Sequence, residues 1–483
     1  MIEHFNQRLQ RHLIERPEAD AVVSGQQRLS YAELAARVAQ GAQYLHGHGI
    51  AAGSVVALAI KDEVEHLLAS ITLLLMGARQ ITIASHDTPS MQASLMSRVG
   101  ATFMVSDHAL LHGHIPVVSW AGMHQQATQC MPDLQAPGSG DLFLRTSGTT
   151  GLTNIVAFSD AQLSHQSSRH HEYASERLLR LASIEHNNSK RHRLYCFWQG
   201  GVNVFLDSAG SDLFDYLAQT QVSCLDISRL HAVGIYKAAH AKPLPEVKVR
   251  TGGSAIPYAV RANILQHLTD QLYVRYATTE TGSITMALPG EHAENESSGR
   301  PLSGVVIGIF DAGGKQLPPG EAGEIGVQCP GMATSYVDNP AQSAQRFKDG
   351  WFYPGDVGQL LPDGQLRIFG RSDEMIVLNG LNIFPKEIED VLEAHPDVVE
   401  SAAIALPSRH HGDIPVAAVS IREGAQLNAA ELLAYCKPHL GMKAPRKIVV
   451  LPQLPRNSQG KILKRDLPPF FNPQLGNVTG HEP

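Results

Sequence analysis

One loop between two short apolar runs constrains this chain more than any other stretch. Residues 142–144 (Leu-Phe-Leu) and 155–158 (Ile-Val-Ala-Phe) are predicted to be buried strands. Between them, residues 146–151 read Thr-Ser-Gly-Thr-Thr-Gly, with two glycines, four hydroxyls and no bulky side chain. Glycine lets a backbone turn its N–H groups inward, and hydroxyls add donors. The loop therefore suits a phosphate, although such residues are also common in ordinary hairpin turns.

Size and composition are typical of a globular enzyme. A chain of 483 residues is long enough for two or more domains, and its 43% apolar and 18% charged content fits a packed core. The formal net charge of −7, without a basic stripe, argues against nucleic-acid binding. The most apolar window, residues 67–78, is too short to cross a bilayer, so no membrane partner is expected.

The cysteines and the N-terminus favour the cytoplasm. The five cysteines are far apart and form no C-x-x-C pattern, which argues against a disulfide framework and against a zinc site. The first twenty residues are charged throughout and do not resemble a signal peptide.

The order of the predicted elements indicates an α/β fold. Residues 55–60 form a continuous apolar run suited to a parallel strand, and strands alternate with helices around it. Short strands between residues 305 and 327 indicate a small β subdomain, and a new α+β pattern begins near residue 373. We predict a large domain of parallel-rich sheets over residues 1–372 and a small, mobile C-terminal domain over 373–483, with a flexible tail from 468.

Two polar stretches follow the glycine-hydroxyl loop. His165, His170 and His171 lack the spacing and fourth ligand of a metal site, so they are expected on a solvated face. Residues 185–193, Glu-His-Asn-Asn-Ser-Lys-Arg-His-Arg, are expected to form a polar loop.

The chain resembles the adenylate-forming superfamily of acyl-CoA synthetases, aryl-acid ligases and peptide-synthetase adenylation domains. The phosphate loop of that superfamily usually reads Thr-Ser-Gly-Thr-Thr-Gly-x-Pro-Lys-Gly, whereas here Thr153 and Asn154 stand at the Pro and Lys positions. Asparagine carries no charge to meet a phosphate. Further segments match in the same order: Thr-Gly-Gly-Ser at 251–254, Tyr-Ala-Thr-Thr-Glu at 276–280, Gly-Trp-Phe-Tyr-Pro-Gly-Asp at 350–356, Gly-Arg-Ser-Asp at 370–373 and Gly-Lys at 460–461.

The resemblance implies a role for each matched residue. The residues implied to bind ATP or AMP are Thr146, Ser147, Gly148, Thr149, Thr150, Gly151, Gly252, Gly253, Ser254, Tyr276, Asp356 and Arg371. Tyr276 would stack on adenine and Asp356 would accept hydrogen bonds from the ribose hydroxyls. The implied catalytic residues are Thr279, Glu280 and Lys461. Glu280 and Thr150 would hold Mg²⁺, a cation that prefers oxygen ligands.

The sequence indicates less about the acid substrate than about the nucleotide. The resemblance assigns Trp198, Gly201 and Ala277 to an acyl pocket, although a core aromatic cluster explains residues 194–201 equally well. The Asp that holds an amine in amino-acid-activating enzymes is missing between 194 and 205, which makes an α-amino acid the less favoured substrate. We expect an aromatic or other small hydrophobic acid.

The implied reaction has two halves. A carboxylate attacks the α-phosphorus of ATP to give acyl-AMP and pyrophosphate, and a thiol then attacks the acyl carbonyl. The small domain would swing about Asp373 between the halves, withdrawing Lys461, while Gly380 would line the thiol tunnel. The thiol is either coenzyme A or the phosphopantetheine of a carrier protein acting in trans. The protein itself would be a monomer or a homodimer.

One alternative is a protein that keeps the fold and binds ATP or an adenylate without catalysis. Four positions depart from the superfamily pattern and favour this alternative: Thr153, Asn154, Ala277 and Pro354. Four retained positions argue against it: Glu280, Asp356, Arg371 and Lys461.

Overall fold

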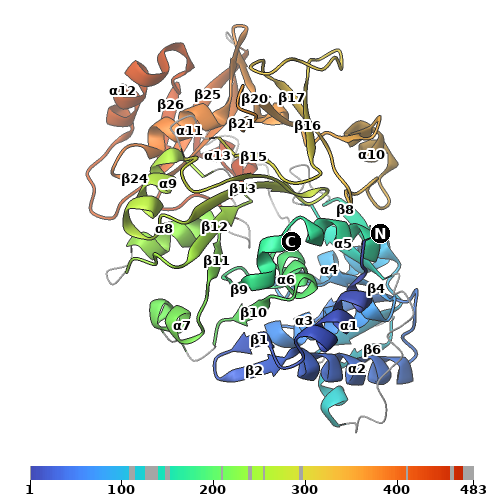
Figure 1. The fold of residues 1–483 in the computed structure, drawn as a ribbon. Helices are drawn as coiled ribbons and strands as arrows, with labels where there is room; N and C mark the ends of the chain where they lie inside the picture. Colours follow the sequence, from blue (N-terminus) through green and yellow to red (C-terminus); the bar gives the residue numbers. More distant parts are fainter. Residues whose placement is uncertain are drawn as a thin grey trace, which may run out of the picture.

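A computed structural model describes residues 2–107, 115–125, 140–146, 153–207, 210, 212–237, 242–253, 256–292, 297–408, 412–456 and 462–471. Within these ranges the chain forms four β-sheets with helices packed against them (Figure 1). Two sheets are mainly parallel, and all their strands lie before residue 302. Two are mainly antiparallel, and their strands follow from residue 306 on. The predicted α/β fold, with a small β subdomain and an α+β C-terminal part, is confirmed.

The nine-stranded sheet runs in the order β15-β14-β13-β12-β11-β9-β10-β1-β2. Its strands are β1 (Asp20–Ser24), β2 (Gln27–Ser30), β9 (Arg177–Arg180), β10 (Val202–Phe205), β11 (Cys224–Ile227), β12 (Lys248–Gly252), β13 (Leu272–Thr278), β14 (Gly282–Ala287) and β15 (Arg300–Pro301). The central pairs are parallel, and the pairs β1–β2, β13–β14 and β14–β15 at the two edges are antiparallel. The parallel strands therefore end at a common edge, from which the loop after β13 emerges.

The second mainly parallel sheet has six strands in the order β6-β5-β3-β4-β7-β8. They are β3 (Val55–Ala59), β4 (Arg79–Thr82), β5 (Phe103–Ser106), β6 (Val117–Ser119), β7 (Asp141–Arg145) and β8 (Ile155–Ser159). Strands β7 and β8 form an antiparallel pair, as predicted for the two apolar runs that flank the glycine-hydroxyl loop.

The helices of this part cover both sheets. They are α1 (Phe5–Glu15), α2 (Tyr31–Gly47), α3 (Glu63–Leu75), α4 (Pro89–Val99), α5 (Asp160–Ser168), α6 (Asn187–Gln199), α7 (Leu213–Gln219), α8 (Arg229–Lys237) and α9 (Tyr258–His267), with the 3₁₀ turns η1 (Trp120–Gln125) and η2 (His171–Ser175). Capping boxes begin α2 at Ser30 and α5 at Ser159, each with its N3 side chain bonded back to the cap. Helices α3 and α6 share one core cluster, whereas α8 and α9 pack on the opposite face of the nine-stranded sheet.

The β subdomain is a sheet whose strands pair antiparallel, with the order β18-β19-β17-β20-β21 and β16 paired to β17. Its elements are β16 (Val306–Phe310), β17 (Gly323–Gln328), α10 (Pro340–Arg346), β18 (Phe347–Lys348), β19 (Trp351–Phe352), β20 (Asp356–Leu360) and β21 (Leu366–Arg371). Strand β20 begins at Asp356 and β21 ends at Arg371, and these two residues are register partners.

The C-terminal part follows the turn η3 (Ser372–Glu374). It contains β22 (Ile376–Leu378), β23 (Leu381–Ile383), α11 (Pro385–Glu393), β24 (Val398–Ser408), β25 (Gly412–Ile421), α12 (Ala429–Leu440), η4 (Gly441–Lys443), β26 (Lys447–Val450), η5 (Lys464–Asp466) and α13 (Pro468–Phe471). It has a core cluster drawn entirely from its own residues, which supports the predicted boundary near Asp373, although that boundary stays a prediction.

The first residues of the predicted tail are part of the fold. Helix α13 spans Pro468–Phe471, and the Phe471 side chain is buried beside Leu454 and Leu467. The carbonyl of Phe471 also accepts a hydrogen bond of 2.8 Å from Lys447. Within the described ranges, no helix combines the length and the apolar composition that crossing a bilayer would need.

Candidate active site

Glu280 lies in the loop between β13 and β14 and is buried. Its Oε1 accepts a hydrogen bond of 2.8 Å from the Tyr336 hydroxyl, and its backbone carbonyl accepts one from the N–H of Ala333. Burial raises the pKa of Glu280, and the Tyr336 and Thr278 hydrogen bonds oppose that rise. A carboxylate held in this way is a strong ligand for a cation brought beside it.

Asp356 lies next to Tyr276 and Arg371. The Tyr276 hydroxyl donates to Oδ2 of Asp356, and Nη1 of Arg371 lies 3.7 Å from Oδ1. Burial raises the pKa of Tyr276 well above its usual value, and the negative charges of Asp356 and Glu280 add to that rise. Because Tyr276 lies on the strand that leads into the loop of Glu280, its bond to Asp356 connects the predicted ribose-binding acid with the strand of the predicted Mg²⁺-binding acid. Asp373, the predicted hinge residue, accepts two hydrogen bonds from Arg371, at 3.1 and 3.0 Å.

The predicted phosphate loop begins where β7 ends. The N–H of Thr146 donates to the carbonyl of Asn154 at 2.8 Å and closes the base of the loop. The side-chain carbonyl of Asn154 accepts a hydrogen bond of 2.8 Å from Asn339, the residue that caps α10. Asn154, which stands where the superfamily usually has lysine, is therefore engaged in a structural contact. The rest of the predicted loop lies outside the described residues: Ser147, Gly148, Thr149, Thr150 and Gly151. Two other predicted site residues also lie outside them, Ser254 and Lys461.

Gly252 and Gly253 end β12 beside β13. A Cβ on Gly252 would come within 2.6 Å of the carbonyl oxygen of Arg275, so a larger residue would push the two strands apart. Gly253 has a φ of +86°, a conformation that favours glycine, and a Cβ there would meet no atom within 4 Å of the described structure. The turn thus presents bare backbone, as the predicted adenine contact requires.

Helix α6 corrects the expectation of a polar loop over residues 185–193. Its polar and charged residues 189–193 are buried, and their partners are polar groups of neighbouring strands and loops. Asn187 donates to the carbonyl of Arg145, and Arg191 donates to the carbonyls of Thr279 at 2.7 Å and Thr278 at 3.1 Å. One helix therefore supports both predicted active-site loops. Sequence reasoning missed Asn187 and Arg191, although the absence of glycine and proline from 185 to 199 was a signal for a helix.

Trp198 and Gly201 are not brought together with the other predicted site residues. The Trp198 indole donates to the carbonyl of Glu3 at 3.2 Å, and the guanidinium carbon of Arg8 lies 4.3 Å from its ring centroid. Trp198 is roughly 16 Å along the helix axis from Asn187, at the end of α6 that faces α1. A Cβ on Gly201 would come within 2.1 Å of the Tyr173 carbonyl, so close packing explains this glycine.

Two other predicted residues have contrasting positions. Ala277 lies in β13 between Tyr276 and the Thr279–Glu280 loop, at a register shift of the β13–β14 pair. Gly380, the predicted thiol-tunnel residue, forms the exposed turn between β22 and β23 with a φ of +82°.

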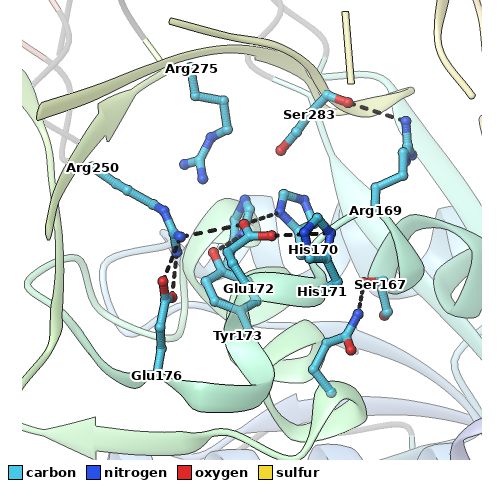
Figure 2. Close-up of polar contacts among 12 residues, drawn as sticks. Ser167, Arg169, His170, His171, Glu172, Tyr173, Glu176, Arg250, Arg275 and Ser283 are labelled. Carbon is cyan, nitrogen blue, oxygen red and sulfur yellow. Dashed lines mark hydrogen bonds and ion pairs between the residues drawn. The ribbon is translucent and has the colours of Figure 1, made fainter. Parts of the chain in front are cut away.

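A network of buried charged and aromatic side chains lies between the nine-stranded sheet and α5, η2 and α6 (Figure 2). Arg250 donates to both oxygens of Glu176 at 2.8 Å, and Nη2 of Arg250 lies 3.4 Å from Oε1 of Glu172. His170 lies in this network, whereas the neighbouring His171 is exposed. The expectation of a solvated face was therefore wrong for His170, because its ring is bonded to Glu172 and covered by His192 and Tyr195 of α6.

The oxygen atoms of Glu280 and Thr278 are ligands that suit Mg²⁺. Among the described residues no cluster of three or more His, Cys, Asp or Glu side chains is arranged for a metal. Glu280 instead offers one buried carboxylate beside the Thr278 hydroxyl, and a divalent cation would offset the cost of burying that charge. Mg²⁺ commonly binds through one or two carboxylates together with substrate phosphates and water. When bound, it would supply positive charge at the phosphates.

The sequence matches known families over most of its length. Residues 9–337 match the profile of the AMP-binding enzyme family, and residues 387–461 match that of the AMP-binding enzyme C-terminal domain. The chain is 27% identical over 479 residues to a 2-succinylbenzoate–CoA ligase of Geobacillus kaustophilus, covering 93% of this chain and 95% of that protein. A shorter match, 34% identical over 222 residues, relates 45% of this chain to 43% of the fatty acid–[acyl-carrier-protein] ligase ScoC of Streptomyces coeruleorubidus.

A solved structure shares the whole fold. ATP-bound MatB from Rhodopseudomonas palustris superposes with a TM-score of 0.88 at 24% identity, over 98% of this chain and 99% of that chain. The N-terminal profile alone covers more than half of the sequence. The chain therefore belongs to the AMP-binding enzyme family, and the predicted class, an AMP-forming acid–thiol ligase, is confirmed by its relatives.

Proposed function

We propose that this protein activates a carboxylic acid with ATP, forming acyl-AMP and pyrophosphate, and then transfers the acyl group to a thiol. The observation that carries this proposal is the hydrogen bond from Tyr276 to Asp356, because Tyr276 lies on β13, the strand that leads into the Thr279–Glu280 loop at the edge where the parallel strands end. Ligands of open α/β sheets bind at that edge. Family membership and the acid–CoA ligase relatives support the same reaction.

The proposed roles follow from the contacts of each side chain. The Tyr276 ring, held by its hydroxyl bond to Asp356, would stack on adenine next to the Gly252–Gly253 backbone. The Asp356 oxygens would accept the ribose hydroxyls, while the Arg371 cation opposes the rise that burial causes in the pKa of that carboxyl. Thr279 and Glu280 would meet the α-phosphate and its Mg²⁺. The C-terminal part would pivot near Asp373 and carry Lys461 to the reacting carboxylate, where a cation offsets the charge that develops in the transition state.

The proposed thiol is that of coenzyme A. Relatives that match over most of the chain are named CoA ligases, whereas the carrier-protein ligase matches over less than half of it. Transfer to a carrier-protein phosphopantetheine in trans is the second choice. The cytoplasm is the proposed compartment, in keeping with the four free cysteines of the described chain.

The second candidate function is binding of ATP or an adenylate without turnover. One observation favours it: the Asn154 amide is bonded to Asn339 and adds no positive charge at the end of the phosphate loop. A protein of this kind would bind ATP and release neither AMP nor pyrophosphate.

The deciding experiment is pyrophosphate exchange into ATP with a panel of carboxylic acids, followed by mass spectrometry for acyl-AMP. We expect exchange with at least one acid, and a loss of at least about 100-fold in Glu280→Gln, because a neutral amide no longer ligates Mg²⁺ or offsets charge. Glu321→Gln, which changes an exposed glutamate, is the matched control. ATP binding without exchange for any acid would support the second candidate instead.

A further inference from the structure

Arg275, Ala277 and Ser283 lie on one face of the nine-stranded sheet. Side chains alternate along a strand, so Arg275 and Ala277 of β13 point to the same side and Tyr276 points to the other. Ala277 is paired with Ser283 of the antiparallel strand β14, and directly opposed residues share a face. Arg275 and Ser283 therefore flank Ala277, the acyl-pocket residue that lies beside Tyr276 and Glu280.

Both side chains carry buried polar atoms without a partner. Arg275 is 3% exposed, and among the described residues it is the one arginine with two buried nitrogens, Nε and Nη2, that lack a hydrogen-bond partner. Ser283 is 1% exposed, and its Oγ also lacks a partner within the described chain. Figure 2 shows the Arg275 guanidinium and the Ser283 side chain pointing into the same space, with Arg250 and His170 at other sides of it.

The positive charge around this space is not fully paired: Arg250 has Glu172 and Glu176 as partners, whereas Arg275 shares Asp226 with another arginine. The remaining contact of Arg275 is to Oδ2 of Asp226 at 3.4 Å, and Arg180 already holds that oxygen at 2.5 Å. Arg169, on the side of Ser283, donates to the carbonyls of Thr281 and Ser283. Burial lowers the pKa of His170 to about 4, so that imidazole is neutral. An unpaired buried donor is costly, whereas a charge-assisted bond to a carboxylate is strong.

We propose that Arg275 and Ser283 bind a second carboxylate of the acid substrate, which makes the substrate class a compact dicarboxylic acid. This inference rests on the proposed function, because the first carboxylate must react beside Ala277 and Thr279. Two residues along a strand span roughly 7 Å, so a short spacer separates the two carboxylates. A buried wall limits the length of the acid: His170, Tyr173, His192 and Tyr195.

The test compares acids in matched pairs. Pyrophosphate exchange is measured with glutarate against pentanoate and with isophthalate against benzoate, for the wild type and for Arg275→Gln. We expect the wild type to prefer the dicarboxylic member of a pair by at least about tenfold in kcat/KM, the gain of one charged hydrogen bond. Arg275→Gln should abolish that preference and leave the KM for ATP unchanged. Ser283→Ala should reduce it by a smaller factor.

Arg177→Gln is the matched control. Arg177 lies in the same sheet and donates to Asp20 and to the Thr220 carbonyl, away from Ala277, so this variant should keep the preference. If Arg275→Gln does not fold, as a melting curve would reveal, Arg275→Lys and Ser283→Ala decide, and both should weaken the preference.

The outcomes separate this inference from the proposed function. A wild type that activates the monocarboxylic acids equally well, with Arg275→Gln unchanged, overturns the dicarboxylate subsite and leaves the ligase function intact. If no acid supports exchange, the ligase function fails, and calorimetric titration with glutarate and with isophthalate then judges the subsite alone. Binding of either by the wild type that weakens at least about tenfold in Arg275→Gln supports the subsite, and equal or undetectable binding overturns it.

Discussion

Lys190 is a buried cation whose described partners are neutral. Its Nζ donates to Gln80 at 2.9 Å and to Thr82 at 3.0 Å, and burial lowers its pKa from 10.5 to about 7. Between pH 7 and 10.5 the unfolded chain therefore holds a proton that the folded protein has released. Stability rises with pH wherever the unfolded state binds more protons, so folding of the wild type gains stability as the pH rises through this window.

Replacing Lys190 by methionine tests this charge. Methionine removes the buried charge at every pH. The stability of Lys190→Met relative to that of the wild type should therefore be highest at pH 6, where the wild type still buries a charged lysine. Its relative free energy of unfolding should fall by about 1 to 3 kcal/mol between pH 6 and pH 9. Urea titrations at several pH values measure the difference. Lys242→Met, at an exposed lysine, should show no such trend, and a pH-independent difference for Lys190→Met would contradict the lowered pKa.

Residues in ordered motifs could be predicted, and residues in the buried network could not. Glu280 and Asp356 follow short strands in recognisable segments, and Asp356 accepts a hydrogen bond from Tyr276, four residues before Glu280. His170 and Arg275 show no such signal, because a charged residue in an isolated stretch is typical of an exposed surface. Their partners come from η2, α6 and distant strands, and a single sequence contains no information about that pairing.

At the scale of elements, α6 connects the fold to the site. Its first half contacts the loops after β7 and β13, and its second half packs on α1. The family resemblance located the loops but not the helix behind them, because seven consecutive polar or charged residues, 187–193, hid its helical pattern. The assignment of Trp198 to an acyl pocket stays a prediction, and its indole lies against Glu3 and Arg8 at the far end of this helix.

Arg191 is the positioning residue of this helix. Arg191→Met removes both donors to the carbonyls of Thr278 and Thr279, so the Thr279–Glu280 loop loses these two hydrogen bonds to α6. We expect kcat for adenylate formation to fall about 10- to 100-fold with a smaller change in the KM for ATP, because misplacement of a catalytic group mainly affects the transition state. Steady-state pyrophosphate release measures both constants.

A second arginine of α6 controls for general damage to the core. Arg193 is also buried but donates to the carbonyl of Val204, on β10. Arg193→Met should lower the melting temperature while leaving kcat nearly unchanged below it. Arg191→Lys should restore part of the activity by supplying one donor. Equal kinetic losses in Arg191→Met and Arg193→Met would show that Arg191 has no specific role in the site.

At the scale of the whole molecule, a partly buried ion pair joins the large and C-terminal parts of the described chain. Arg229 begins α8, and its Nη2 donates to Glu393 at the end of α11; Figure 1 shows these helices on neighbouring sides of the boundary. Glu393 also accepts a hydrogen bond of 3.0 Å from the N–H of Ser401. Burial raises the pKa of Glu393, and the Arg229 cation opposes that rise. If the C-terminal part swings about Asp373, this pair must break and reform.

Arg229→Met should therefore loosen the boundary. Removing one partner of a buried pair leaves an uncompensated charge and costs about 3 to 5 kcal/mol. We expect faster proteolysis between residues 371 and 376, and a change of at least about threefold in the ratio of thioester formation to adenylate formation, since the two halves need different orientations. Leu230→Ala, at an exposed neighbour on the same helix, should change neither.

A double variant separates the charge from the packing. Glu393→Gln keeps the shape of the side chain and the acceptor for Ser401 but removes the negative charge that Arg229 compensates. Arg229→Met combined with Glu393→Gln should therefore be less susceptible to proteolysis than Arg229→Met alone, because no buried charge is left unpaired. The susceptibility of Arg229→Met should also decrease as the pH falls toward 5, because the raised pKa of Glu393 lets that carboxyl become neutral. Additive effects of the two substitutions, with no pH dependence, would mean that the boundary is held by packing and that the ion pair does not bias the swing.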